Sequence, residues 1–193
     1  MKRHQELLTA AIARDGDGQR ALMAGDGQGA CEAFLSAADL YRQSWEEAPP
    51  GSYGRLVGML KATVLSGDDP RQAAGYVQRG LAGDPNADRS PTACYALALA
   101  ALIEGDDDDA ARSAAAMRGG SDAFDRTAAA IAALAERDGD AYAGAVREIV
   151  HDFEQRSAHL TGVAIADTAL ALERLARRLG LAPALPASPT LPD

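Results

Sequence analysis

Apolar residues recur along most of this chain at intervals of three and four, the spacing that places side chains on one face of an α-helix. The stripe of Ala30, Phe34, Ala37, Tyr41 and Trp45 predicts a helix over about residues 28–47. The same spacing predicts further helices over about 2–14, 18–23, 52–66, 70–82, 90–104, 107–118, 121–138, 140–153 and 162–179. We therefore expect an all-α protein of about nine to ten helices.

The predicted helix boundaries follow from residues that break or cap helices. Aspartate alternates with glycine over residues 15–18, so we expect the first helix to end there and a short one to follow. Ser52 follows a Pro-Pro-Gly turn and is placed to cap the next helix. Ser90 precedes Pro91 in the order typical of a helix start.

A glycine followed by aspartate, with a small residue five or six positions after the glycine, recurs four times. The interval between successive glycines shortens along the chain, so the repeats are degenerate. Repeated turns of this kind predict helical hairpins that must stack, because one hairpin alone cannot bury its apolar face. The four turns are Gly25-Asp26, Gly67-Asp68, Gly105-Asp106 and Gly139-Asp140.

The C-terminal part of the chain predicts a helix over about 162–179 and then a different kind of segment. Asp167, Arg174 and Arg178 fall on the side opposite the apolar stripe, so we expect this helix to cap the stack with one solvated face. Prolines then recur every third residue, which favours polyproline II. We predict one helical-repeat domain over 1–179 and a proline-rich tail over 180–193.

The amino-acid composition and the net charge limit the classes of partner that we expect. Alanine is the commonest residue and aromatic residues make up only 5%, a mixture that favours helices over sheets. The net charge of -9, without a cluster of basic residues, argues against nucleic acid and anionic membranes as partners. No apolar stretch is long enough to span a bilayer, and Cys31 and Cys94 fall in helical patterns as small apolar residues. We expect a cytoplasmic protein.

The densest group of polar residues that could carry chemistry is Glu148, His151, Asp152, Glu154 and His159. Such side chains can bind a metal ion or act as acid and base. On a helix, however, Glu148 and Asp152 share one face, whereas His151 and Glu154 share another. We therefore predict a solvated helix face carrying an ion pair between Asp152 and Arg156, with no metal, no cofactor and no catalysis. An enzyme or a metal-binding protein that uses residues 148–159 is one alternative.

The turns and their flanking residues resemble the tetratricopeptide repeat over about residues 18–155. The segment 21–37 is similar to the second half of that repeat, with Gly25-Asp26 at the turn and Ala30, Phe34 and Ala37 at its small, aromatic and small positions. Leu97, Ala98 and Ala101 match positions of its first helix. The resemblance implies a right-handed stack of antiparallel helical hairpins with a concave wall lined by the first helix of each pair.

A fainter resemblance links residues 53–58 and 165–170 to uncharacterised helical proteins of GC-rich actinobacteria and to bacterial immunity proteins. The second of these implies a toxin as the partner. An immunity protein is therefore another alternative for the function.

On the tetratricopeptide plan, Val57, Lys61, Tyr95, Leu99 and Leu102 would line the concave wall. Apolar side chains in an open groove need a cover. A bound peptide, a second copy of the chain in a homodimer, and the chain's own tail are the three candidates, and we favour the tail.

The leading hypothesis is a non-catalytic protein-binding or scaffolding module, whose partner is a protein or peptide. Packing of the first hairpin onto the second is the competing explanation for two of its candidate residues, Trp45 and Tyr53. The candidate binding residues are Trp45, Tyr53, Arg55, Lys61, Tyr95 and Leu99.

Overall fold

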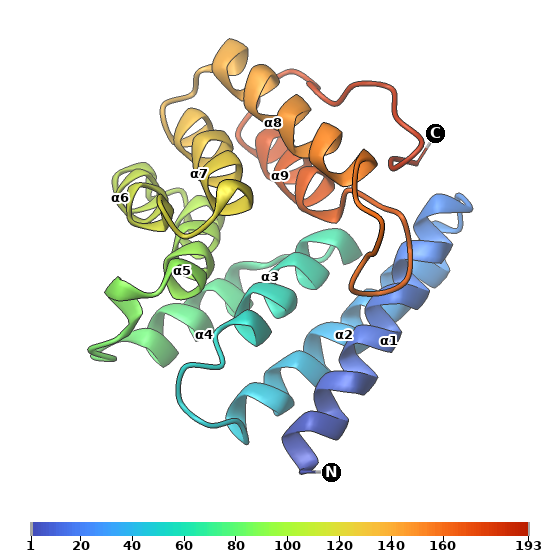
Figure 1. Cartoon of the computed structure of the whole chain (residues 1–193), viewed down its shortest axis with the longest axis vertical. Coiled ribbons are helices and arrows are strands. Elements are labelled where there is room, and N and C mark those ends of the chain that lie inside the picture. Colours follow the sequence, from blue (N-terminus) through green and yellow to red (C-terminus); the bar gives the residue numbers. More distant parts are fainter. Residues whose placement is uncertain (1, 193) are drawn as a thin grey trace.

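The computed structural model describes residues 2–192, and over this range the fold is all-α, as predicted (Figure 1). Nine α-helices and one short 3₁₀ segment, η1 at Ala87–Arg89, follow one another without a strand in these residues. The helices are α1 Arg3–Met23, α2 Gly27–Glu46, α3 Gly54–Ser66, α4 Arg71–Leu81, α5 Pro91–Glu104, α6 Asp107–Met117, α7 Asp122–Ala135, α8 Gly139–Glu154 and α9 Asp167–Arg178.

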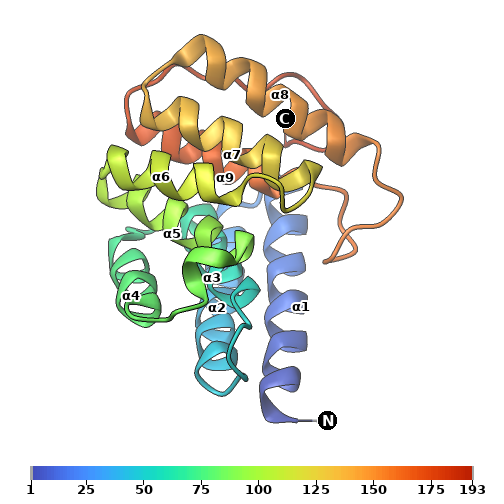
Figure 2. The same ribbon diagram turned by 60° about the vertical axis from the view of Figure 1, so that its left-hand side comes forward.

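Neighbouring helices pair along the chain. Helices α1 and α2 form a long pair at one end of the molecule, and α5 with α6 and α7 with α8 form pairs toward the other end (Figures 1 and 2). Helix α4 packs more extensively on α5 than on α3. No helix between residues 2 and 192 combines the length and the apolar character needed to cross a membrane.

The repeated turns use two devices, a residue with positive φ and an aspartate cap. Gly25 and Gly105 adopt left-handed φ angles of 74° and 81°, which glycine tolerates without strain. Asp26 and Asp106 then accept a hydrogen bond from the backbone N–H three residues later. These two turns therefore end one helix and begin the next.

The fourth turn lies two residues earlier in the chain than the predicted Gly139-Asp140. Arg137 has the positive φ, at 57°, and Asp138 caps α8 by accepting from the N–H of Ala141. Gly139 is already the first residue of that helix. In the second turn Gly67 is left-handed and ends α3, but α4 begins only after Pro70.

The prediction that residues 15–18 end the first helix is wrong, because α1 is continuous from Arg3 to Met23. A Cβ atom on Gly18 would lie 2.8 Å from the ring of Phe34, so the missing side chain lets α1 approach α2 closely. Asp15 is buried and hydrogen-bonded to Tyr41 and Gln19. Tertiary packing thus outweighs the low helix propensity of glycine and aspartate at this point.

The serine caps were predicted with mixed success. Ser90 accepts a hydrogen bond from the N–H of Ala93 and caps α5 as expected. Ser52 does not cap α3, since its hydroxyl donates back to the carbonyl of Pro49 at 2.8 Å and Tyr53 occupies the cap position.

Helix α9 differs from the predicted capping helix in both its start and its surroundings. It begins at Asp167 and packs against α3, α7 and α8. Glu173 is only 2% exposed, and Arg174 donates to the carbonyl oxygens of Val64 and Leu65 at the end of α3. The predicted solvated face is therefore wrong for Asp167 and Arg174, because both side chains contact α3 across the fold.

The tail after α9 is held against the helices but does not cover the predicted groove. Leu191 is 8% exposed, and the backbone N–H of Ala166 donates to the carbonyl of Thr190 at 2.8 Å. Ala184 donates its N–H to the carboxylate of Glu173. In Figure 1 the tail runs beside α8 and α9, and α9 rather than the tail packs on α3, which carries Val57 and Lys61 of the predicted concave wall.

The close approach at Gly18 gives a first prediction. We expect Gly18→Ala to lower the free energy of unfolding by about 1–3 kcal/mol, because the new methyl group must displace the Phe34 ring. Gly144→Ala, in α8 with open space for 4 Å around an added methyl group, is the matched control and should raise stability by about 0.5–1 kcal/mol. Urea unfolding followed by circular dichroism measures both, and equal effects of the two substitutions would contradict this account of α1.

Candidate functional site

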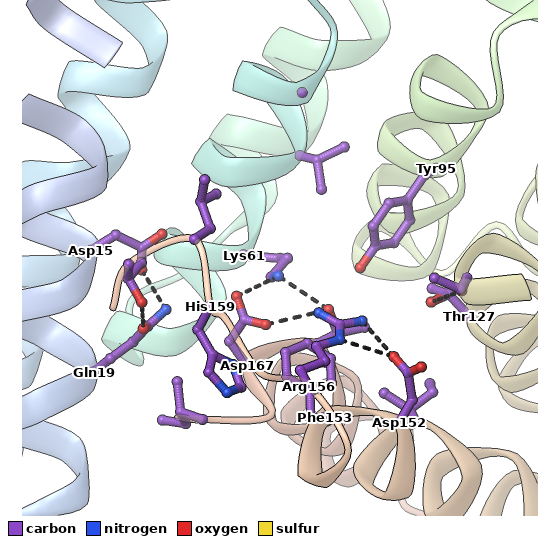
Figure 3. Close-up of a pocket in the computed structure, with 18 of the residues that line it drawn as sticks. Asp15, Gln19, Lys61, Tyr95, Thr127, Asp152, Phe153, Arg156, His159 and Asp167 are labelled. Atoms are coloured by element: carbon purple, nitrogen blue, oxygen red, sulfur yellow. Dashed lines mark hydrogen bonds and ion pairs between the residues drawn. The ribbon is translucent and has the colours of Figure 1, made fainter. Parts of the chain in front are cut away.

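A hollow of about 330 Å³ lies where α1, α3, α5, α7, α8 and α9 come together (Figure 3). We call it the central pocket and define it by its charged and polar lining residues Asp15, Lys61, Tyr95, Arg126, Asp152 and Asp167. The segment 159–165, which connects α8 to α9, forms part of its wall. Its volume is near the lower end of the range of about 300–1,000 Å³ that is typical of ligand sites.

Lys61 and Asp167 form an ion pair in the wall of the pocket, between α3 and the start of α9. The Lys61 Nζ atom lies 2.5 Å from Asp167 Oδ2 and donates to the hydroxyl of Thr168 at 3.1 Å. Burial lowers the pKa of Lys61, but Asp167 together with Tyr95 and Asp15 outweighs burial and leaves that pKa above its ordinary value. Lys61 is therefore charged and held in place.

Asp15 contributes a carboxylate from α1. One of its oxygens accepts from the Tyr41 hydroxyl at 3.1 Å and the other from Gln19 at 3.2 Å. Burial, followed by repulsion from Asp167, raises the pKa of Asp15 to about 6. The Asp15 carboxylate is thus ionised near neutral pH, and its ionisation lowers the stability of the folded chain.

Two arginines share one carboxylate on another wall of the pocket. Arg126 of α7 and Arg156 each place a guanidinium nitrogen 2.5 Å from an oxygen of Asp152 in α8. The Arg156 guanidinium also stacks over the Phe153 ring, 3.7 Å from its centroid. This cluster carries one positive charge more than Asp152 can neutralise.

Tyr95 supplies a buried hydroxyl that makes no hydrogen bond of ordinary geometry with the described residues, although Thr168 lies beside it. Its side chain is 8% exposed and packs edge-on against Phe124, with ring centroids 6.4 Å apart. Buried polar atoms are normally hydrogen-bonded, and an unpaired one costs about 1–3 kcal/mol. A hydroxyl that lines a hollow without a partner is therefore a natural point of contact for a ligand.

Of the six predicted binding residues, Lys61 and Tyr95 line the central pocket. Leu99 is 2% exposed and belongs to the core. The other three, described next, make contacts that join helices to one another.

Trp45 and Tyr53 pack together with ring centroids 5.9 Å apart, and the Tyr53 hydroxyl donates to Asp84 at 2.7 Å. Arg55 donates from Nε to the hydroxyl of Ser44, which itself donates to the carbonyl of His4. These contacts join α1, α2 and α3 and agree with the packing explanation for Trp45 and Tyr53.

The predicted segment 148–159 divides into two groups. Asp152, Arg156 and His159 line the pocket, and the ion pair predicted between the first two is confirmed. Glu148, His151 and Glu154 are exposed and do not line the pocket. Within residues 2–192 no group of three or more histidine, cysteine, aspartate or glutamate side chains is arranged to hold a metal ion.

Three residues of the pocket were missed from the sequence. Asp15 fell in a segment predicted to be a turn, and Asp167 was assigned to a solvated face. Arg126 meets Asp152 across 26 positions, and no local pattern reveals such a pair. The one available indication was that Asp15 and Gln19 stand four residues apart, the spacing of neighbours on a helix.

Comparisons with protein-family models, with curated proteins and with solved structures found no match to this chain. The resemblances to tetratricopeptide repeats and to immunity proteins therefore stay predictions.

The environment of Asp15 gives a second prediction. Because its pKa is raised from 3.8 to about 6, the folded chain binds more protons than the unfolded chain between those values, and Asp15 costs stability as the pH rises through that window. We expect the Asp15→Asn variant to match the wild type near pH 4 and to exceed its free energy of unfolding by about 3 kcal/mol above pH 6. Urea unfolding at a series of pH values measures the difference, and a gap that stays constant with pH would contradict the assignment.

Proposed function

We propose that this chain is a non-catalytic binding module whose ligand enters the central pocket. The observation that carries the proposal is the buried Tyr95 hydroxyl, which faces the hollow without a partner beside the fixed charge of Lys61. A group that binds here would supply the hydrogen bond that this hydroxyl lacks.

The charged side chains support binding rather than catalysis. Lys61, Asp167, Arg126 and Asp152 are each held by an ion pair at 2.5 Å. Groups fixed in this way are suited to orient a ligand, whereas proton transfer needs a group free to gain or lose its proton near neutral pH. Asp15 has a pKa of about 6, which lies in that range.

The position of α9 changes the form that binding would take. A partner laid along an open concave wall would compete with α9, which packs there on α3 and α7. The central pocket instead admits a group of limited size, such as a free small molecule or one side chain of a protein or peptide. The expected protein or peptide partner therefore stays a prediction, now with a specific point of entry.

The two alternative functions, an enzyme and an immunity protein, rest on separate observations. An enzyme gains one observation, because Asp152, Arg156 and His159 line the same pocket as Asp15. An immunity protein rests on the sequence resemblance alone.

Blocking the pocket gives a third prediction. Gly54 is exposed, lines the pocket at the first position of α3, and has nothing within 4 Å of a side chain added there. We expect Gly54→Trp to leave the fold intact and to abolish ligand binding by obstructing the entrance. Gly139→Trp is the matched control, since Gly139 is also an exposed first residue of a helix with open space around it.

The measurement is native mass spectrometry of each full-length variant after incubation with a cell extract. Adducts on the wild type and on Gly139→Trp that are absent from Gly54→Trp support the proposal, and their masses separate small molecules from protein partners. A bound compound that is chemically altered on the wild type alone would favour the enzyme. Adducts on all three proteins, or on none, would refute binding in the central pocket.

A further inference from the structure

We propose that the central pocket takes a zwitterion, a small molecule whose ammonium and carboxylate groups are separated by an apolar spacer. This inference rests on the proposed binding function and names the chemistry of the ligand. It follows from the way in which the charges and the apolar side chains are distributed around the hollow.

One side of the pocket has an excess of negative charge. Asp15 lines the hollow on this side, and the neighbouring Lys61–Asp167 ion pair leaves its charge unbalanced. Lys61 is already bonded to Asp167 and Thr168. Each oxygen of Asp15 accepts one hydrogen bond and has a second lone pair free. An ammonium group placed here would relieve the repulsion between the two carboxylates.

The other side has an excess of positive charge. Arg126 and Arg156 share the single carboxylate of Asp152, and the unpartnered Tyr95 hydroxyl faces the same hollow. A guanidinium has five N–H donors, and Arg126 uses one of them on Asp152. A carboxylate placed here could accept from the N–H groups that Arg126 does not use on Asp152, and it would balance the second arginine.

The two sides are well separated. In Figure 3 Asp15 and Gln19 stand on one side of the hollow and Tyr95, Thr127 and Asp152 on the other, with the Lys61–Asp167 pair between them. The remaining wall includes Val57, Phe124, Ile149, Phe153, Val163 and Ile165. A ligand that reaches both charged sides must therefore carry its two charges apart and fill the space between them with apolar groups.

Two sources supply this chemistry, a free ω-amino acid and a short apolar peptide with free termini. Both present an ammonium at one end and a carboxylate at the other. They differ in the spacer, which is a flexible hydrocarbon chain in the first and contains an amide in the second.

Isothermal titration of the full-length chain near pH 8 with a matched set of probes gives the fourth prediction. At that pH, about two units above the pKa of Asp15, the carboxylate is ionised. We expect ε-aminocaproate to bind at least about tenfold more tightly than caproate or hexylamine, each of which has the same chain with one charge. Glycine, which has no spacer, should bind weakly, and the dipeptide alanyl-leucine tests the peptide source.

Two variants assign the ends of the ligand. Asp15→Asn should weaken the binding of ε-aminocaproate and hexylamine but leave the binding of caproate unchanged, because it removes negative charge from the side that holds the ammonium group. Arg126→Gln should weaken the binding of ε-aminocaproate and caproate but leave the binding of hexylamine unchanged, because it removes positive charge from the side that holds the carboxylate. Arg147→Gln, at an exposed position of α8, is the control for loss of an arginine and should change none of them. A merely structural effect would weaken all three probes together.

The outcomes separate this inference from the proposed function. Tighter binding of either zwitterion, with the crossed effects of the two variants, supports the inference and identifies the source. Equal binding of a singly charged probe and ε-aminocaproate, lost in Gly54→Trp, would overturn the zwitterion while the binding function stands. If no probe binds although the extract yields a pocket ligand, the zwitterion is again overturned. If neither binds, both proposals fall.

Discussion

The structure depends on the contact between α9 and α3, helices that lie about a hundred residues apart in the chain. Asp167 pairs with Lys61 where α9 begins, and Arg174 donates to the last carbonyl groups of α3. On its other side α9 buries Glu173, which accepts hydrogen bonds from Tyr142 of α8 and from Ala184 of the tail. A buried charge without a partner is strongly unfavourable, so these polar pairs fix both the position and the rotation of α9.

Placing α9 there determines what remains available for function. Helix α9 packs on the concave wall that an open stack of hairpins would present. The segment 159–165, which precedes α9, lies against the pocket together with α1 and α8. What remains is a partly open hollow bounded by six helices, with charged groups of opposite sign on its opposite sides. The ion pairs that hold the fold together are therefore also the walls of the candidate site, so stability and ligand recognition share residues.

Local patterns in the sequence predicted much of the fold and little of this site. The periodic apolar residues, the Ser90 cap and the turn at Gly105-Asp106 depend on near neighbours, and the structure confirms them. Asp15 was misread because the packing of Gly18 against Phe34, which keeps α1 helical, is a tertiary contact. Arg126 and Asp167 owe their roles to distant partners, Asp152 and Lys61, and a single sequence carries no sign of such pairs.

Amide hydrogen exchange in α9 tests this account most directly. If α9 is part of the core, its amides over 171–178 should exchange within about tenfold of those of α5, which is buried on nearly every side. The exposed connection over 155–160 provides the fast-exchanging reference in the same protein. Exchange of α9 as fast as that connection would contradict the account, because the concave wall would then be open and the central pocket would lose one of its sides.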